Sequence, residues 1–268
     1  MSEIILVPPG ESFELKPEDP VFAHGLGLFE TMKLEGGKLC FWSAHWTRLS
    51  GSACRLGLDC PFSSDDVLVQ WRRFIEMTCL RDGILKLSLV RAPDGARLFL
   101  YARQAHPWPE SLQVQLREDV PVNERSLLAG HKTHNYMETL LLFQQVRAAG
   151  YDEAVRLNSA GALAEATMAN LFFYHGGRLC TPSLECGLLP GVVRAEVMQL
   201  AEVNEGIFLP EALMEAEAAF LTNSAIGLRP VRALGGRTLP WGPEVSGSFE
   251  ALRSAFEAHE QRTGIQLA

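Results

Sequence analysis

The stretch 152-DEAVRLNSAGALAEATMANLFFYH-175 holds two apolar runs of strand length, 153-EAVRLN-158 and 170-NLFFYH-175. The glycine pair 176–177 follows and can supply a tight turn into a third strand. One carboxylate, Glu165, lies among small apolar residues between the two runs. A carboxylate in such a setting is either exposed in a turn or held beside a cationic partner.

Helices and strands mix along the rest of the chain without the regular alternation of a parallel α/β protein. The patterns predict helices over about 43–56, from 64 onward, 136–149, 192–201 and 245–261, with Ser43 as a helix cap. They predict further strands around the turn at Gly36-Gly37 and over 84–92, 97–105, 111–120, 206–209 and 218–222. We therefore expect an α+β fold of two lobes, a smaller N-terminal lobe over 1–120 and a larger C-terminal lobe over 121–268.

Bulk composition narrows the class of protein. The 268 residues carry a formal net charge of −8, which argues against nucleic acid and anionic membranes as main partners. Six cysteines include no CxxC pair, so neither a zinc ribbon nor a thioredoxin-like site is predicted. The N-terminus lacks a basic, apolar signal pattern, and no apolar run approaches the ~20 residues of a membrane span. These features favour a cytoplasmic protein with free thiols.

The motifs of dinucleotide-binding, metal-binding and hydrolase sites are incomplete or absent in this sequence. His24-Gly25-Leu26-Gly27 lacks the third glycine and the following helix of a dinucleotide site, so a tight turn is the better interpretation. His131 and His134 have no third ligand at matching spacing, and no metal site is predicted. There is no GxSxG elbow, and no cysteine has a convincing local base.

Features compatible with a phosphate group are more numerous. In 187-GLLPGVVRAEV-197 a Pro-Gly turn starts a helix, whose first N–H groups can bind an anion. In 220-FLTNSAIGLRPV-231 a strand leads into the small polar residues 222–224. Arg48 could add a bidentate clamp, although its spacing alone favours a solvated helix face. Together with Lys132 and Glu165, these residues could supply a lysine, a phosphate site and a carboxylate, which a pyridoxal phosphate enzyme needs. These residues are compatible with a PLP site, but by themselves they do not distinguish it from other uses of the same residue types.

Seven segments resemble the class IV aminotransferases, the fold-type IV family of enzymes that use pyridoxal 5'-phosphate (PLP). They occur in the family's order and span most of the chain: 25-GLGLFETMKLEGGKL-39, 45-HWTRL-49, 132-KTHNY-136, 152-DEAVRLNSAGALAEATMANLFF-173, 181-TP-182, 187-GLLPGVVR-194 and 220-FLTNSAIGLRPV-231. The resemblance implies the two-lobed D-amino acid aminotransferase-like fold, with the cofactor between the lobes, and a homodimer.

The resemblance also assigns roles to individual residues. Lys132 matches the lysine that forms the Schiff base with PLP, and Glu165 matches the acid that pairs with the pyridine nitrogen. The phosphate binders that match are Arg48, the backbone N–H groups of Val192 and Val193, and Ser224.

Two further matches are looser. Arg91 falls where relatives place an arginine for the substrate carboxylate, and Thr31 is a candidate catalytic polar group near the leaving group. Two departures bear on the site. Leu26 stands where the family often has Asp, and Val193 stands where relatives often have Thr.

The family contains both lyases and transaminases. The compact length, 27-GLFETMK-33 and Asn223-Ser224 favour 4-amino-4-deoxychorismate lyase, which releases pyruvate and 4-aminobenzoate for folate synthesis. A branched-chain or D-amino acid aminotransferase is the alternative within the family. A protein that binds PLP without catalysis is the alternative from another class, and intact Lys132 and Glu165 argue against it.

Overall fold

The computed structural model describes residues 2–104 and 107–267, which fold into two compact units. Unit 1 contains Met1–His106, His131–Asn135 and His259–Ala268, and unit 2 contains Pro107–Gly130 and Tyr136–Ala258. These units are discontinuous in sequence, unlike the expected division at residue 120. Residues 107–120 belong to unit 2, whereas the short segment around Lys132 and the last ten residues belong to unit 1.

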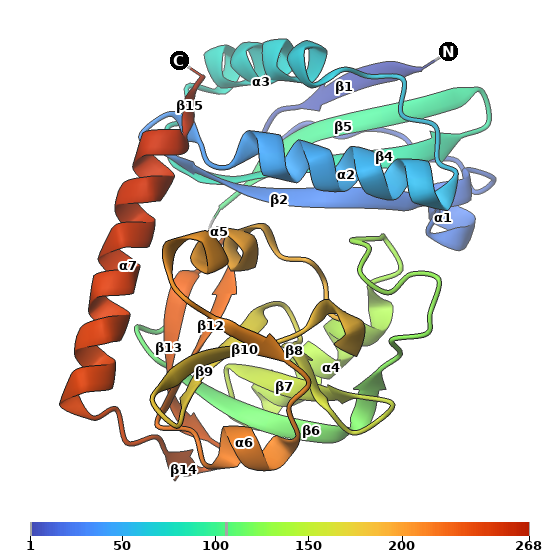
Figure 1. The fold of residues 1–268 in the computed structure, drawn as a ribbon. Helices are drawn as coiled ribbons and strands as arrows, with labels where there is room; N and C mark the ends of the chain where they lie inside the picture. Colours follow the sequence, from blue (N-terminus) through green and yellow to red (C-terminus); the bar gives the residue numbers. More distant parts are fainter. Residues whose placement is uncertain (1, 105–106, 268) are drawn as a thin grey trace. The chain divides into compact units, whose positions relative to one another are not determined.

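Unit 1 is built on a six-stranded sheet with the strand order β1-β5-β4-β2-β3-β15 (Figure 1). Its strands are β1 (Glu3–Val7), β2 (Gly27–Glu35), β3 (Lys38–Leu39), β4 (Gly83–Ala92), β5 (Gly95–Arg103) and β15 (Ile265–Gln266). β1 pairs in parallel with β5, and the other described pairs are antiparallel. The hairpin predicted around Gly36-Gly37 and the two strands predicted after residue 83 are confirmed.

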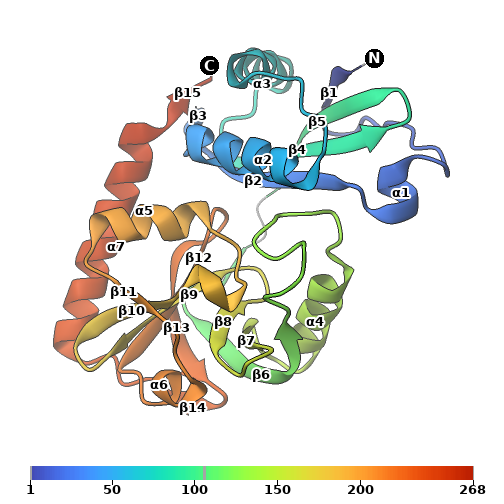
Figure 2. The ribbon, with the colours of Figure 1, turned by 45° about the vertical axis from the view of Figure 1, so that its right-hand side comes forward.

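Two long helices, α2 (Trp42–Leu56) and α3 (Ser64–Thr78), cover one face of this sheet (Figure 2). The short helix α1 (Pro20–His24) precedes β2. Buried side chains of α2 and α3, such as Leu49 and Trp71, pack with Leu85, Leu87 and Leu89 of β4 in one apolar core. Since residues in a strand alternate between faces, the odd-numbered leucines of β4 define the helix-covered face.

The start of α2 differs from the prediction. Ser43 lies inside the helix, and the N-cap is Phe41, which has a φ of 52° and makes no side-chain cap. α3 instead begins with a full capping box, in which the Ser63 hydroxyl accepts the Asp66 N–H and the Asp66 carboxylate accepts the Ser63 N–H. The serine pattern therefore indicates a cap at the second helix and not at the first.

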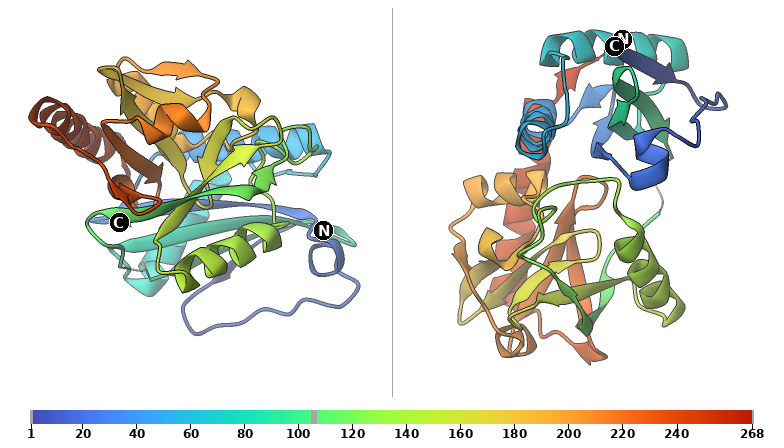
Figure 3. Two further views of the ribbon diagram at one scale, coloured as in Figure 1. Left: turned by 90° about the horizontal axis from the view of Figure 1, so that it is seen from below. Right: turned by 90° about the vertical axis from the view of Figure 1, so that its right-hand side faces the viewer.

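Unit 2 contains a nine-stranded sheet, with the order β11-β10-β9-β12-β13-β6-β7-β8 and β14 paired to β13. Figure 3 gives two further views of the ribbon, in which the strands of this sheet run from green to orange. Its strands are β6 (Leu112–Val122), β7 (Glu153–Asn158), β8 (Leu163–Ala166), β9 (Asn170–His175), β10 (Arg178–Pro182), β11 (Asn204–Gly206), β12 (Ala218–Asn223), β13 (Gly227–Leu234) and β14 (Arg237–Thr238). The opening stretch of sequence thus folds as β7, β8 and β9. The strand predicted over 206–209 is wrong beyond Gly206, because β11 lies earlier.

The helices of unit 2 are α4 (Met137–Ala148), α5 (Val192–Leu200), α6 (Pro210–Met214), a 3-10 turn, η1 (Leu184–Cys186), and α7 (Pro243–Thr263) as far as Ala258, after which α7 belongs to unit 1. Stacked rings of Phe172 and Phe220, with centroids 5.1 Å apart, pack against Phe249 of α7. Leu171, Phe173 and Leu221 point to the other face, into a second core. The mixed α+β architecture expected from the sequence is confirmed. No helix among residues 2–104 and 107–267 combines the length and apolar character that a membrane crossing requires.

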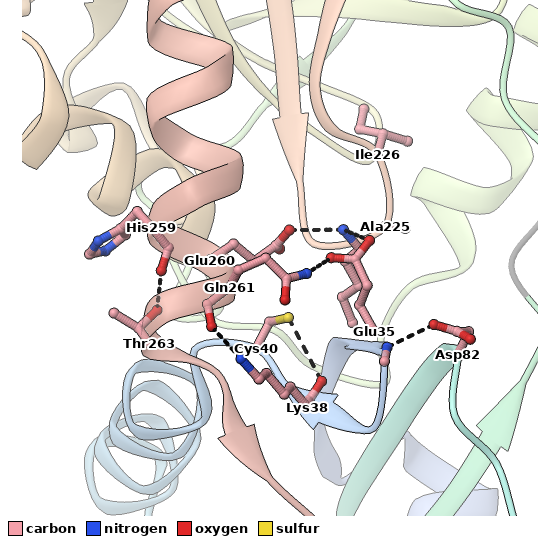
Figure 4. Close-up of polar contacts among 12 residues, drawn as sticks. Glu35, Lys38, Cys40, Asp82, Ala225, Ile226, His259, Glu260, Gln261 and Thr263 are labelled. Carbon is pink, nitrogen blue, oxygen red and sulfur yellow. Dashed lines mark hydrogen bonds and ion pairs between the residues drawn. The ribbon is translucent and has the colours of Figure 1, made fainter.

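The C-terminal residues of the chain close the edge of the unit 1 sheet (Figure 4). β15 pairs with β3, and Lys38 Nζ donates to the backbone carbonyl of Gln261 at 2.9 Å. Nearby, Lys33 Nζ lies 2.8 Å from a carboxylate oxygen of Glu260, which is 3% exposed. Burial raises the pKa of Glu260, while its hydrogen bond to Lys33 acts in the opposite direction. Burial likewise raises the pKa of the neighbouring Cys40 thiol to about 12, which keeps it protonated.

Lys33→Met tests how far this end of the chain depends on the ion pair. The variant leaves the Glu260 carboxylate buried without its nearest cation, and we expect a loss of about 3 kcal/mol at pH 8. A folded-state pKa above the unfolded value means that stability falls as the pH rises through it, so the loss should be smaller at pH 5. Urea unfolding at both pH values measures this.

The matched control is Lys38→Met, because Lys38 makes an exposed hydrogen bond to a backbone carbonyl. We expect this variant to change stability by less than about 0.5 kcal/mol at either pH. Equal losses at pH 5 and pH 8 for Lys33→Met would show that lost packing, and not an uncompensated carboxylate, causes the effect.

Candidate active site

Lys132 is held against the start of β2 in unit 1. The Phe29 N–H donates to the Lys132 carbonyl at 2.9 Å, and the His134 N–H donates to the Gly27 carbonyl at 2.9 Å. Between them, Leu28 and Thr133 form an isolated antiparallel bridge. Lys132 Nζ lies 4.5 Å from the centroid of the Phe29 ring. Residues 132–134, from the middle of the chain, are thereby aligned with a strand whose first residue, Gly27, lies 105 positions before Lys132.

Gly27 is required for this close approach. A Cβ at Gly27 would lie 2.6 Å from Cδ2 of His134 and 2.9 Å from the backbone oxygen of Leu89. The Leu89 oxygen belongs to the backbone of β4 and cannot rotate away, whatever the His134 ring does. The glycine of 25-GLG-27 therefore serves the placement of the Lys132 segment and not a dinucleotide, in agreement with the failed fingerprint.

The two histidines beside Lys132 anchor its segment. His131 Nδ1 lies 2.9 Å from the hydroxyl of Ser52 in α2, and the His134 ring packs against Phe29 with centroids 5.5 Å apart. Burial lowers the pKa of both histidines, with Arg55 adding to the effect at His131 and Lys86 at His134. The described residues contain no cluster of three or more His, Cys, Asp or Glu that could hold a metal ion.

Arg48 belongs to a buried charge cluster, so the solvated helix face suggested by its spacing is wrong. Its Nε and Nη2 donate to the two carboxylate oxygens of Glu30 at 2.8 and 2.5 Å, and its side chain is 11% exposed. His45 Nδ1 lies 2.7 Å from Glu30 Oε2. Burial by itself would raise the pKa of Glu30, but Arg48, with His45, lowers it to about 2. Burial lowers the pKa of His45 despite its bond to Glu30.

Glu30 was missed by sequence reasoning. The sequence marks Glu30 only as an acidic residue at a position of β2 that the strand alternation directs to the helix-covered face, opposite Leu87 of β4. An acidic residue at such a position needs a buried partner, and Arg48 supplies it from α2. The ion pair fixes the direction in which the Arg48 guanidinium points.

Thr31 and Arg91 lie on opposite faces of the unit 1 sheet. Thr31 is directly opposite Lys86 in the β2–β4 register, on the face that carries Phe29. Arg91 is an odd-numbered residue of β4 and follows the core leucines onto the other face. It is exposed and lines a cavity of about 680 Å³ together with His24 and Leu26. The structure thus brings Thr31, and not Arg91, to the face of the sheet that carries Phe29.

Glu165 lies in β8 of unit 2, half-buried, and not in a turn. Its Oε2 accepts the backbone N–H of Leu189 at 3.0 Å and an amide N–H of Asn170 at 3.4 Å. The same Asn170 amide donates to the Leu189 carbonyl at 2.9 Å. Asn170, which sequence reasoning also missed, therefore ties the carboxylate to the loop that leads into α5.

The N-terminus of α5 offers backbone donors. Gly191 is the N-cap and makes no side-chain cap, and Val192 and Val193 have buried side chains. Only their N–H groups can therefore serve an anion at this helix end. Ser224 lies in the tight turn between β12 and β13. Asn223 shapes this turn, because its Oδ1 accepts the N–H groups of Ala225 and Ile226 at 2.8 and 3.0 Å.

A second carboxylate, Glu153, fixes the turn between β8, which carries Glu165, and β9, which begins with Asn170. It is fully buried at the start of β7 and accepts the N–H groups of Thr167 and Met168, both at 3.0 Å, and the Thr167 hydroxyl. Burial raises the pKa of Glu153 to about 7, against these hydrogen bonds. Glu153 thus anchors the β8–β9 turn from inside unit 2, a role that its position at the end of a helix-to-strand loop did not indicate.

Gly191→Ala tests the coupling between Asn170 and the start of α5. The added Cβ would lie 1.9 Å from Asn170 Oδ1, so the Asn170 side chain would have to leave its bonds to Leu189 and Glu165. We expect a loss of about 2–3 kcal/mol in thermal or urea unfolding. In contrast, Gly247→Ala in α7 meets nothing within 4 Å and should be neutral or stabilising by up to about 1 kcal/mol. Similar stabilities for the two variants would contradict the tight contact.

The candidate site residues lie within the part of the chain that matches known proteins. The model of the amino-transferase class IV family matches residues 27–234, from the first residue of β2 to the last of β13. An aminodeoxychorismate lyase from Bacillus subtilis is 27% identical over 236 residues, which cover 81% of this chain and 80% of the relative.

Two solved structures illustrate the likeness of fold. A candidate 4-amino-4-deoxychorismate lyase from Legionella pneumophila superposes with a TM-score of 0.86 and 26% identity, covering 94% of this chain and 99% of that one. The PLP-bound form of a hypothetical aminotransferase from Mycobacterium tuberculosis has a TM-score of 0.80 at 20% identity, covering 92% and 94%. The predicted fold is thereby confirmed. Since the family model spans most of the chain, this chain belongs to the class IV aminotransferases, a family of enzymes.

Proposed function

We propose that this chain is a PLP-dependent 4-amino-4-deoxychorismate lyase, which releases pyruvate and 4-aminobenzoate for folate synthesis. The observation that carries the proposal is the agreement of two independent comparisons. A lyase relative covers about four fifths of both chains, and a candidate lyase structure matches nearly the whole of this one.

The residues of both units fit PLP. When bound, PLP supplies an aldehyde for covalent attachment of an amine and a ring that withdraws electrons from it. Unit 1 offers the amine of Lys132, a residue whose backbone segment is held against β2 by hydrogen bonds. Unit 2 offers the N–H groups at the start of α5, which have no side-chain cap, and the buried Thr222 hydroxyl, two positions before the β12–β13 turn, which has no hydrogen-bond partner among residues 2–104 and 107–267.

Each residue then has a defined task. Glu165 would bind a protonated ring nitrogen, and its bond from Leu189 holds the carboxylate in one orientation for this purpose. Arg48, oriented by Glu30, and Ser224 would bind phosphate with the N–H groups of Val192 and Val193.

Lys132 would take a proton at Nζ and return it elsewhere on the substrate. A general base of this kind contributes roughly 10²–10⁴-fold to the rate. Thr31, on the face of the sheet that carries Phe29, would assist the leaving group. Arg91 would bind the carboxylate of a substrate that reaches the other face of the sheet, where Arg91 lines a cavity.

The runner-up function is transamination of a branched-chain or D-amino acid. It uses the same lysine and carboxylate, and the match to the amino-transferase class IV family supports it as a class. Asn223 does not separate the two functions, because its side chain is occupied by the β12–β13 turn and by the Met168 carbonyl. A protein that binds PLP without catalysis is the remaining alternative.

We further propose a cytoplasmic homodimer. Met137, Leu140 and Leu141 form an apolar stripe along α4 and are 73%, 45% and 48% exposed, and Leu127 is 89% exposed. A monomer rarely leaves such a stripe uncovered, and a second copy of the chain would bury it. Light scattering on the purified protein should give twice the chain mass of 29.6 kDa. Changing Met137 and Leu141 together to Glu should shift the population toward monomer, whereas a monomeric wild type would refute the dimer.

A product assay with a lysine variant tests the proposed activity. Wild-type protein loaded with PLP should form pyruvate and 4-aminobenzoate from aminodeoxychorismate without an oxo-acid acceptor. Lys132→Ala should lose the visible absorbance of the bound cofactor and at least ~10²-fold of the rate. Lys38→Ala, at an exposed hydrogen bond, should retain both.

Other outcomes discriminate among the proposals. Turnover of a branched-chain or D-amino acid that requires 2-oxoglutarate would replace the lyase by the aminotransferase. Binding of PLP without turnover of any amine would support the non-catalytic alternative. A Lys132→Ala variant with wild-type rate would refute the role of Lys132 in all of them.

A further inference from the structure

Two lysines of unit 1 share one aromatic ring. Lys132 Nζ lies 4.5 Å from the centroid of Phe29, and Lys86 Nζ lies 4.6 Å from the same centroid. The two nitrogens are therefore no farther apart than the sum of these distances, about 9 Å. The Lys86 amine also lies 5.9 Å from the Tyr101 ring centroid. Neither the family motifs nor the cofactor contacts proposed above assign a role to Lys86.

Lys86 is a half-buried cation whose described surroundings are aromatic or cationic. Within residues 2–104 and 107–267 it has two ring contacts and no ion pair with a carboxylate. Burial lowers the pKa of Lys86, and Arg103 acts in the same direction. The charge of Lys86 in turn lowers the pKa of His134, two residues after Lys132. A cation without an anion raises the electrostatic potential around every amine nearby.

We infer that Lys86 is a positioning residue, whose positive charge disfavours the protonated form of Lys132 and so increases the neutral amine available for chemistry. The catalytic value of this effect rests on the proposed function, whereas the effect on protonation does not. Two unit charges about 9 Å apart, at an effective dielectric constant near 20, shift each other by roughly one pKa unit.

Other charges around Lys132 do not replace this effect. Glu30 is negative and would favour a charged lysine, but Arg48 neutralises it with a bidentate ion pair. His45, whose pKa is lowered partly by the charge of Lys132, is buried beside Glu30. The Phe29 ring attracts both ammonium groups. Replacing Lys86 leaves the contact of Lys132 with this ring in place, so a variant isolates the charge of Lys86.

The test measures how readily the Lys132 amine reacts as a function of pH. The full-length chain is stripped of cofactor and labelled with a trace of acetic anhydride, and the peptide that contains Lys132 is quantified by mass spectrometry. Lys86→Met should raise the midpoint of Lys132 labelling by about one pH unit. Lys86→Arg keeps the charge and should leave the midpoint near the wild-type value. Lys38→Met, which removes an exposed lysine of the same unit, should also leave it unchanged.

Two outcomes would overturn the inference. One is a Lys86→Met midpoint equal to that of the wild type. The other is an equal shift in Lys86→Arg, which would indicate a packing effect of the side chain. Lys86→Gln provides a second neutral variant, with circular dichroism as the check of folding, should Lys86→Met not fold. Because labelling requires neither cofactor nor turnover, an inactive protein with the expected shift would refute the proposed function and leave the inference intact.

Discussion

The structure around the candidate lysine depends on the pairing of 132–134 with the first residues of β2. Two backbone hydrogen bonds and one bridge connect a loop in the middle of the sequence to the central strand of the unit 1 sheet. The pairing requires a glycine at position 27, because any side chain there would meet His134 and the Leu89 carbonyl. Bonds of this kind depend on backbone geometry alone, so they place Lys132 accurately without using its side chain.

β2 then separates two kinds of chemistry by the alternation of its side chains. Glu30 points to the helix-covered face, where Arg48 and His45 compensate its charge. Phe29 and Thr31 point to the other face, where Lys132 and Lys86 approach the Phe29 ring. One face therefore holds a balanced anion, and the other holds cations that aromatic rings partly compensate. A carboxylate beside an amine favours its charged form, and Glu30, the carboxylate of β2 nearest to Phe29 in sequence, is paired with Arg48 on the opposite face.

Much of the fold could be predicted from local patterns, and much of the site could not. The glycine turns at 36–37 and 176–177, the start of α5 at Val192 and the end of α2 at Leu56 follow from residue types within a few positions. Glu30 bonds to Arg48 18 positions later, Glu153 to Thr167 14 positions later and Asn170 to Leu189 19 positions later, so no local pattern reveals these contacts. The spacing of Arg48 even indicated solvent exposure, because helical periodicity does not report a carboxylate contributed by a strand. The resemblance named Lys132 and Glu165, yet it did not indicate which residues orient them.

The paired strands β7 and β8 of unit 2 each carry a carboxylate, and the two differ in burial. Glu153 is fully buried and accepts hydrogen bonds from the 167–168 turn, and burial raises its pKa. Glu165, twelve positions later, is half-buried and is held by one backbone N–H and one amide. A group that is to bind a ligand has to be held in position without being sealed in the interior. Glu153 supplies the rigid anchor by fixing the 167–168 turn, and the bonds from Leu189 and Asn170 orient Glu165. Under the proposed function, this arrangement would orient the carboxylate that binds the ring nitrogen.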